Sequence, residues 1–213
     1  MDHVARYSDV RVYTIGHSSH PLEIFTALLK LHQIEIVADV RSTPHSAHAP
    51  QFNREVLPGA LKAHGLRYVF LGDALGGRPA DKAFYDGEGF VRYDWLAASP
   101  DFLHGIERLM EGIRKYCVVL LCSEEYPRAC HRRRLVGRVL REAGVHVLHI
   151  RHSGEVEPEE RLMAEEQSAR DKGQRLLFGL NGSQQWRSAQ SLTGPGKARQ
   201  GPDADLTRPS PDD

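Results

Sequence analysis

Residues 117–134 read CVVLLCSEEYPRACHRRR, and this stretch decides the fold. Its first five residues are apolar and include two β-branched valines, which is typical of a buried strand. A short polar loop and a helix start follow, and a strand of a parallel sheet presents side chains to a site in this order. The loop and helix start carry two thiols, two carboxylates, an imidazole and several guanidinium groups. The stretch therefore predicts a buried strand that ends at a functional site.

The rest of the chain repeats this alternation of apolar runs and helical patterns. Strands are expected at 12–15, 34–40, 66–71, 117–121 and 145–150. Helices are expected at 21–29, 54–64, 99–113 and 130–143, and a long glycine-rich connection at 72–93. Strands separated by helices form right-handed βαβ units. We therefore expect an α/β, Rossmann-like fold, with an open, mostly parallel sheet of about five strands flanked by helices.

The length and the change of composition along the chain predict one core domain with additions. A chain of 213 residues with 40% hydrophobic content can build one core. We expect the α/β core domain at 1–153 and a C-terminal helical appendage at 154–186 that docks on it. The appendage includes a charged helix at 157–170 and the apolar residues 176–178. Residues 187–213 are almost without apolar side chains, which predicts a disordered polar tail.

Composition also narrows the class of protein. The formal net charge is zero, so bulk charge does not indicate a nucleic-acid binder. No apolar run approaches the ~18 residues that span a bilayer, and the N-terminus lacks the pattern of a signal peptide. Three cysteines, an odd number, argue against a disulfide framework. We expect a soluble, cytoplasmic protein with no membrane partner.

The strand assignments bring distant residues to one crevice, because ligands of open α/β sheets bind beyond the carboxyl ends of the strands. The candidate catalytic residues are Cys122, His17, Glu124 and His131, and the candidate ligand-binding residues are Gly16, Ser18, Asp39, Arg41, Gly76, Gly77 and Arg132. Backbone N–H groups at 16–18 can hold an anion, although the segment is neither a dinucleotide fingerprint nor a P-loop. A plain turn is the alternative there. Asp39 and Arg41 share a strand face, so they either form an internal ion pair or position a substrate.

Three features of the 122–134 stretch have competing interpretations. Cys122 and Arg128 match the C-x₅-R spacing of phosphatase loops, but the acidic residues between them and the lack of glycine make this a coincidence. Cys122, Cys130 and His131 can ligate a metal with a fourth ligand from elsewhere, such as His17, or the cysteines can be small buried hydrophobes. We assign no metal ligand here.

The arginines at 132–134 lie in the first turn of the expected helix, where the macrodipole disfavours cations. Glu124 and Glu125 can compensate them in a structural ion-pair network. An anionic ligand is the functional alternative, because arginine suits bidentate recognition of phosphate or carboxylate. At most one or two of the three side chains can reach a site.

Together these motifs make the chain resemble a bacterial and archaeal family, the domain of unknown function 488 (DUF488). The resemblance rests on Tyr13–Ser18, Asp39–Arg41 with Pro44, Pro50–Asn53, Leu75–Gly77, Cys122–Glu124, Pro127 and Cys130–Arg132, and covers residues 12–150. Residues 176–179 are also similar to the family, whereas Arg134 and the polar tail lie outside the pattern. The resemblance implies the fold and the place of the site, and it leaves the reaction open.

The residues favour an enzyme that acts on a small anionic or nucleotide-like ligand. Cys122 is then a nucleophile or redox-active thiol whose pKa is lowered by Arg132 and the helix N-terminus. His17 or His131 is the acid/base, Glu124 its orienting group, and Arg41 and Arg132 clamp the substrate. The alternatives are a binding module for a nucleotide or nucleic acid, and a Cys/His metal-binding protein. The residues identify no cofactor.

Overall fold

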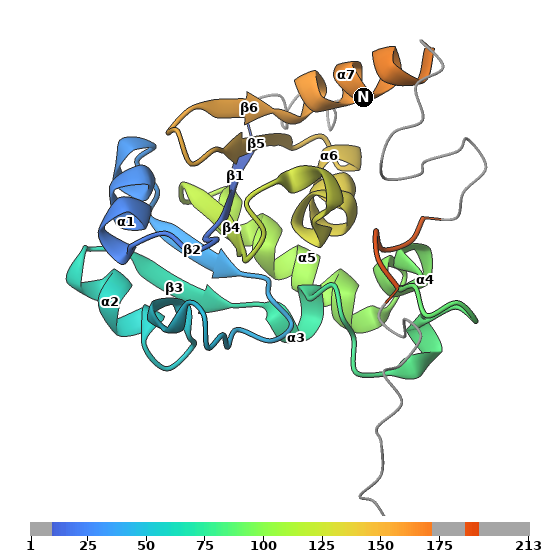
Figure 1. Ribbon diagram of the computed structural model, residues 1–213, viewed down its shortest axis with the longest axis horizontal. Helices are drawn as coiled ribbons and strands as arrows, with labels where there is room; N and C mark the ends of the chain where they lie inside the picture. The colour runs from blue at the N-terminus through green and yellow to red at the C-terminus, as the bar shows by residue number, and fades with distance from the viewer. Residues whose placement is uncertain (1–9, 172–185, 192–213) are drawn as a thin grey trace, which may run out of the picture.

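The computed structural model describes residues 10–171 and 186–191, and its centre is a six-stranded sheet (Figure 1). The strands are β1 (Arg11–Gly16), β2 (Ile36–Asp39), β3 (Arg67–Phe70), β4 (Val118–Cys122), β5 (His146–Ile150) and β6 (Val156–Pro158). Their order is β3-β2-β4-β1-β5-β6. The first five pair in parallel, and β6 is antiparallel to β5. The predicted α/β fold with a mostly parallel sheet is confirmed.

Helices cover both faces of the sheet. The α-helices are α1 (Leu22–Leu31), α2 (Leu57–Ala63), α3 (Gly72–Leu75), α4 (Tyr93–Ala97), α5 (Pro100–Ile113), α6 (Arg138–Glu142) and α7 (Glu159–Asp171). Short 3₁₀ turns are η2 (Pro50–Phe52), η3 (Lys82–Phe84) and η4 (Pro127–Ala129), and η5 (Arg132–Gly137) is a π-helical segment. The α1 and α2 helices lie on one side of the sheet, and α5 and α6 lie on the other (Figure 1).

Two hydrophobic cores result, one on each face, and β4 contributes to both. Val119 and Leu121 pack with the apolar residues of α1 and α2. Val118 and Leu120 pack with those of α5, η5 and α6. Because successive side chains of a strand point to opposite faces, a strand buried on both faces reads as a continuous apolar run. This is why residues 118–121 show no polar alternation, and all five residues of β4 are buried.

The topology places a crevice at the carboxyl end of β4. The chain leaves β1 and β2, the two neighbours of β4, toward α1 and α2 on one face. It leaves β4 toward η5 and α6 on the opposite face. Adjacent strands whose connections diverge in this way leave space beyond their ends, and ligands of open α/β sheets bind there.

Three elements differ from the sequence-based expectation. The antiparallel strand β6 is an addition to the five predicted strands, and its three residues are too few for a periodic signal. The glycine-rich connection at 72–93 contains α3, η3 and the start of α4. The helix predicted at 130–143 begins as the π-helical segment η5, a widening that hydrophobic spacing does not report.

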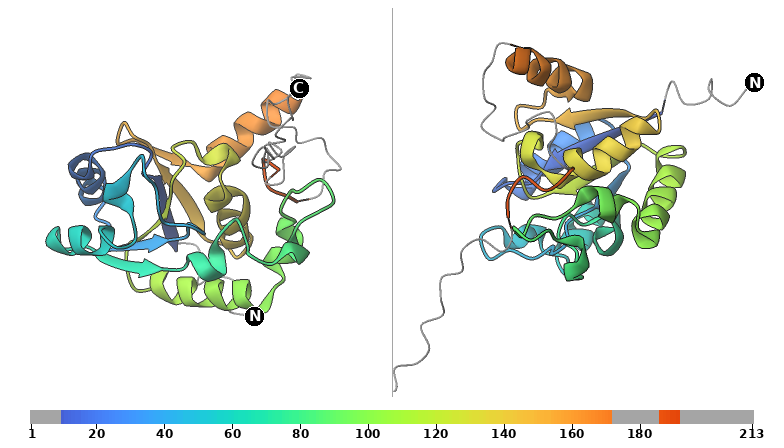
Figure 2. Two further views of the ribbon diagram at one scale, coloured as in Figure 1. Left: turned by 60° about the horizontal axis from the view of Figure 1, so that its bottom comes forward. Right: turned by 90° about the vertical axis from the view of Figure 1, so that its right-hand side faces the viewer.

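The C-terminal part of the described chain contacts the core in two places. The α7 helix follows β6 at one edge of the sheet (Figure 1), and it confirms the helix expected at 157–170. Residues 186–191 lie beside α4 (Figure 2), where the Ser188 N–H donates to the Val91 carbonyl over 2.9 Å. The apolar residues 176–178 and most of the expected tail lie outside the described residues. Within the described ranges, no helix combines the length and apolarity needed to cross a membrane.

Candidate functional site

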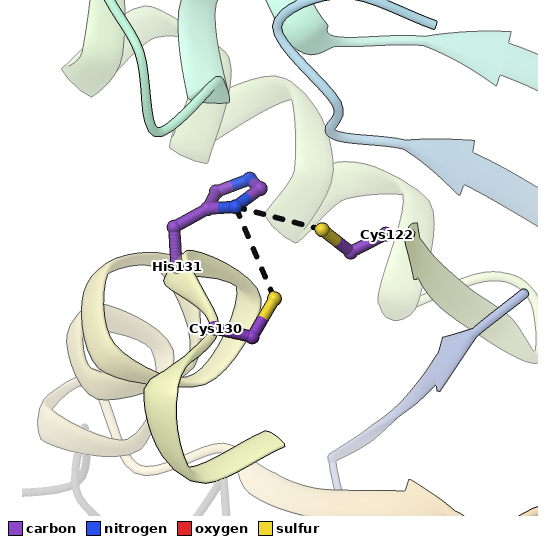
Figure 3. A group of neighbouring side chains, drawn as sticks. All are labelled: Cys122, Cys130 and His131. Atoms are coloured by element: carbon purple, nitrogen blue, oxygen red, sulfur yellow. Dashed lines mark hydrogen bonds between the residues drawn. The ribbon is translucent and has the colours of Figure 1, made fainter. Parts of the chain in front are cut away.

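Cys122, Cys130 and His131 meet at the carboxyl end of β4. Cys122 is the last residue of β4, and Cys130 and His131 directly precede η5 (Figure 3). The Nδ1 atom of His131 lies 3.6 Å from the Cys122 sulfur and 4.0 Å from the Cys130 sulfur. All three side chains were named from the sequence, and the structure brings them together.

The orientation of the His131 ring is fixed from two sides. Its Nε2 donates to the carbonyl of Val40 over 2.8 Å, and a carbonyl can only accept, so Nε2 carries a proton. Nδ1 is therefore the atom that faces the two thiols. Gly77 lies against the ring, because a Cβ at that position would approach the His131 Cβ and Cγ to 2.5 Å. Gly77 thus gives His131 the room it occupies.

The three groups differ in their charge. The hydrogen bond from the Cys130 thiol, with the charges of His131 and Arg132, outweighs burial and holds the pKa of Cys122 well below its ordinary value. Burial and the neighbouring Cys122 raise the pKa of Cys130 well above the ordinary value. Burial alone would lower the pKa of His131, but Cys122 and the Val40 carbonyl raise it. These directions favour a thiolate–imidazolium pair with a neutral second thiol beside it.

A cavity of about 470 Å³ lies over this cluster. Of the predicted site residues, five line it: Arg41, Gly77, Cys122, Glu124 and His131. Sequence reasoning did not name the other lining residues, which are Ser42, Thr43, His45, Ser46, Arg78, Tyr93, Ser123, Ala129 and 188–190. In the loop after β2, the serines and histidines were the sequence feature that could have identified these lining residues. Nothing in the sequence indicated that residues 188–190 would reach the site.

His17, Arg41 and Asp39 form a closed polar network beside the cavity. Arg41 donates to both carboxylate oxygens of Asp39, over 2.9 and 2.6 Å, and to the Phe52 carbonyl over 2.8 Å. The Tyr68 hydroxyl also donates to Asp39. The internal ion pair considered for Asp39 and Arg41 is thus present, with both side chains buried.

His17 has both ring nitrogens engaged in this network. Nδ1 donates to the Ser18 carbonyl over 2.7 Å, and Nε2 accepts from Arg41 over 3.0 Å. Burial, followed by the charge of Arg41, lowers the pKa of His17 from 6.5 to about 4. The ring stacks on Phe52 with centroids 4.3 Å apart. His17 is therefore neutral and does not line the cavity, so His131 is the better acid/base candidate.

The segment 16–18 connects β1 to the loop after β4 through its backbone. The His17 and Ser18 N–H groups donate to the Cys122 and Ser123 carbonyls, over 2.9 and 2.8 Å. A Cβ at Gly16 would lie 1.8 Å from the Glu124 carbonyl oxygen, so only glycine allows this approach. Two N–H groups predicted to face a ligand thus bind the protein instead. Gly76 has a similar packing role against Gly72 and Ser42.

Arg132 is fully buried and holds the loop after β4. Its guanidinium donates to the carbonyls of Glu124 and Glu125, and its Nε donates to the Thr14 hydroxyl over 3.3 Å. Arg132 does not line the cavity, so its charge lowers the pKa of Cys122 from within the protein. Its predicted role as a substrate clamp has no direct contact with the cavity to support it.

The neighbouring arginines pair with or hydrogen-bond to residues of the C-terminal elements. Arg133 pairs with Glu159 over 2.7 Å and Glu166 over 2.6 Å, both on α7. Arg134 donates to the Arg187 carbonyl over 3.1 Å. Arg128 pairs with Glu165 and Glu166, which agrees with its spacing from Cys122 being a coincidence. This arginine run is therefore largely an internal ion-pair network and not an exposed basic face.

A second buried polar network continues from Arg132 across the sheet. The Thr14 hydroxyl donates to His149 Nδ1 over 2.7 Å, and His149 Nε2 donates to Glu159 over 2.9 Å. Burial lowers the pKa of His149 from its ordinary value, which favours the neutral ring. The network joins β1, β5 and α7, and Thr14, His149 and Glu159 do not line the cavity.

The donor atoms of Cys122, Cys130 and His131 all lie within 4.8 Å of one another. Soft ions such as Zn²⁺ bind sulfur and imidazole nitrogen with tetrahedral geometry. The cluster therefore has the donor set for such an ion, with a fourth position left for a ligand from the cavity. Among the described residues it is the one group of three or more such donors within reach of one another.

The fold and the site together define an α/β protein of the doubly wound class with a thiol–imidazole pair at the end of its central strand. Residues 21–139 match the family described as domain of unknown function DUF488, which is more than half of the 213 residues. The chain belongs to this family, as the sequence motifs predicted. The matched range includes Cys122, Cys130 and His131. Comparisons with curated proteins and with solved structures gave no match.

Proposed function

We propose that the protein is an enzyme that uses Cys122 as a nucleophile on a small anionic substrate bound in the cavity. One observation carries the proposal: Cys122 lines the cavity, and its sulfur lies 3.6 Å from an imidazole nitrogen of His131. A nucleophile within reach of a base that a third group orients is the common arrangement for covalent catalysis. Here the orienting group is the Val40 carbonyl.

The chemical step follows from the charges of the pair. The Cys122 thiolate forms a bond to the electrophilic atom of the substrate. The bond from that atom to the leaving group breaks, and the leaving group keeps the electron pair. His131 Nδ1 then gives its proton to the leaving group, and His131 becomes neutral and ready to act as a base for the next step.

The cavity lining supports a substrate with negative charge. Arg78 and His45 are exposed at the wall, and Arg41 adds a guanidinium that Asp39 partly neutralises. Hydroxyl groups of Ser42, Thr43 and Ser46 can donate hydrogen bonds to anionic oxygens. Glu124 is the one carboxylate among the lining residues. Arginine beside hydroxyl donors favours carboxylate or phosphate groups.

Two alkylating reagents of similar size and different charge test this proposal. The protein is used with Cys117→Ser, because Cys117 is the thiol at the other end of β4. We expect iodoacetate to alkylate Cys122 faster, relative to iodoacetamide, than it alkylates a free thiol in solution. Arg78→Gln should lower that ratio several-fold, because the cation attracts the carboxylate.

The proposal fails if Cys122 reacts with neither reagent, or if the ratio equals that of a free thiol and does not respond to Arg78→Gln. Arg114→Gln is the matched control, because Arg114 does not line the cavity and its replacement should leave the ratio unchanged.

A further inference from the structure

The nucleophilic role of Cys122 leaves the second thiol of the cluster without a function. Cys130 is 1% exposed and does not line the cavity, whereas Cys122 is 6% exposed and does. Both sulfurs contact the same nitrogen of His131. The site thus contains one thiol at the cavity and one directly behind it.

The two sulfurs are neighbours in one cluster. They lie within 4.8 Å of each other, and both are beside the Nδ1 atom of His131. A disulfide needs a sulfur separation of about 2.05 Å, so the two side chains must move toward each other to form one. Cys130 lies in the short connection between η4 and η5, outside any strand, and Cys122 is the terminal residue of β4.

We infer that the substrate is a small anionic disulfide, and that Cys130 is the resolving thiol of a thiol–disulfide exchange. The inference rests on the proposed function, because Cys122 must first act as the nucleophile. It adds the electrophilic atom, which is a sulfur of the substrate, and it gives the second thiol a chemical role. Attack by the thiol that lines the cavity and release by the one that does not match the different positions of the two residues.

The exchange takes two steps. The Cys122 thiolate attacks one sulfur of the substrate, forms a mixed disulfide, and releases the first substrate thiolate, which takes the proton of His131. His131 then accepts the proton of the Cys130 thiol. Cys130 attacks the Cys122 sulfur, the bond between Cys122 and the substrate breaks, and the second thiolate leaves and takes from His131 the proton that came from Cys130. The protein loses two protons and two electrons, and the substrate disulfide gains them to become two thiols.

The structure allows two other roles for Cys130, and the experiment must separate them. Cys130 can act only as a hydrogen-bond donor that keeps Cys122 ionised, and then serine would replace it. It can also be a ligand of a soft metal ion together with Cys122 and His131. Under either role the cluster forms no internal disulfide in the exchange.

The probe is dithiobis(nitrobenzoate), an aromatic disulfide that carries two carboxylates and releases a coloured thiolate. Reduced, full-length protein with Cys117→Ser is mixed with the probe, before and after treatment with a chelator. We expect two coloured thiolates per chain, a product lighter by two hydrogens, and a Cys122–Cys130 disulfide in the peptide map. Adding Cys130→Ser should release one thiolate and leave the other half of the probe on Cys122.

The remaining outcomes overturn specific parts of the account. A stable adduct on Cys122 while Cys130 is present would overturn the resolving role and leave the nucleophile intact. Equal reaction rates with and without Cys122→Ser would remove the proposed function as well. Reaction that starts only after a chelator removes a bound ion would assign the cluster to a metal and overturn the exchange.

Discussion

His17 follows β1 and His131 follows β4, which are neighbouring strands. The two rings differ in their contacts and in the direction of their pKa shifts. His17 is enclosed by Arg41 and the Ser18 carbonyl, and its pKa falls to about 4. His131 is anchored by one carbonyl, and its other nitrogen faces two thiols below a cavity, with a raised pKa. The first ring belongs to a network in which both nitrogens have partners. The second ring lies beside Cys122 at the cavity, where a ligand can reach both side chains.

Within one crevice, the groups around His17 form a structural network, and the groups around His131 form the candidate reactive site. Polar groups that satisfy one another inside the protein stabilise the fold, and their loss costs folding free energy. A thiolate held beside an imidazolium at a cavity is poised to react with a ligand. The Asp39–Arg41–His17 side should therefore respond to mutation mainly in stability, and the Cys122–His131 side mainly in reactivity.

Asp39→Ala should give the largest effect on stability, because it leaves the buried Arg41 guanidinium without its carboxylate. Breaking a buried pair by removing one partner costs about 3–5 kcal/mol of unfolding free energy. Urea denaturation measures this loss. Asp94→Ala is the control, because its pair with Arg92 is more exposed, and exposed pairs contribute about 0–1 kcal/mol. Equal losses in the two variants would contradict the assigned difference.

Acid should destabilise the protein through His17. The pKa of His17 is about 4 in the folded protein and 6.5 ordinarily, so the unfolded chain binds the proton more tightly. Stability is therefore fully present above pH 6.5 and is lost as the pH falls toward 4. At about 1.4 kcal/mol for each pKa unit, the contribution is about 3 kcal/mol at most.

Urea denaturation between these pH values, compared with His17→Gln, isolates the His17 contribution. The variant should have a flatter dependence of unfolding free energy on pH in this window. Parallel curves for the two proteins would show that His17 is not held neutral by the fold.

Cys122→Ser should have the smallest effect on stability, about 1 kcal/mol, because the hydroxyl fits the space and can contact His131. The same change should remove all fast alkylation in the Cys117→Ser protein. Unfolding free energy and alkylation rate are measured on one preparation. A large loss of stability with little change in alkylation would reverse the roles assigned to the two sides of the crevice.

Much of the fold follows from the sequence, because strands buried on both faces give continuous apolar runs. Residues 118–121 show this, and the crossover helices between strands fix the topology. The strand β6 and the π-helical η5 were not predictable, because one is very short and the other keeps the hydrophobic spacing of a helix.

The sequence also placed the candidate residues at one crevice, but it could not distinguish inward-facing from cavity-facing side chains. His131 and Arg132 are adjacent in the chain, yet one lines the cavity and the other is fully buried. That choice depends on the start of η5 and on Gly77, which leaves room for the imidazole. Likewise, His17 is enclosed because Phe52 and Arg41, which come from other segments, contact its ring.

The dependence on pH of Cys122 alkylation by iodoacetamide tests the central claim most directly. In the Cys117→Ser protein, the rate should stay high well below the ordinary thiol pKa of about 8.5, because Cys130, His131 and Arg132 keep Cys122 ionised. His131→Gln should move the profile toward that ordinary value. A profile centred near the ordinary thiol pKa and unchanged by His131→Gln would contradict the account.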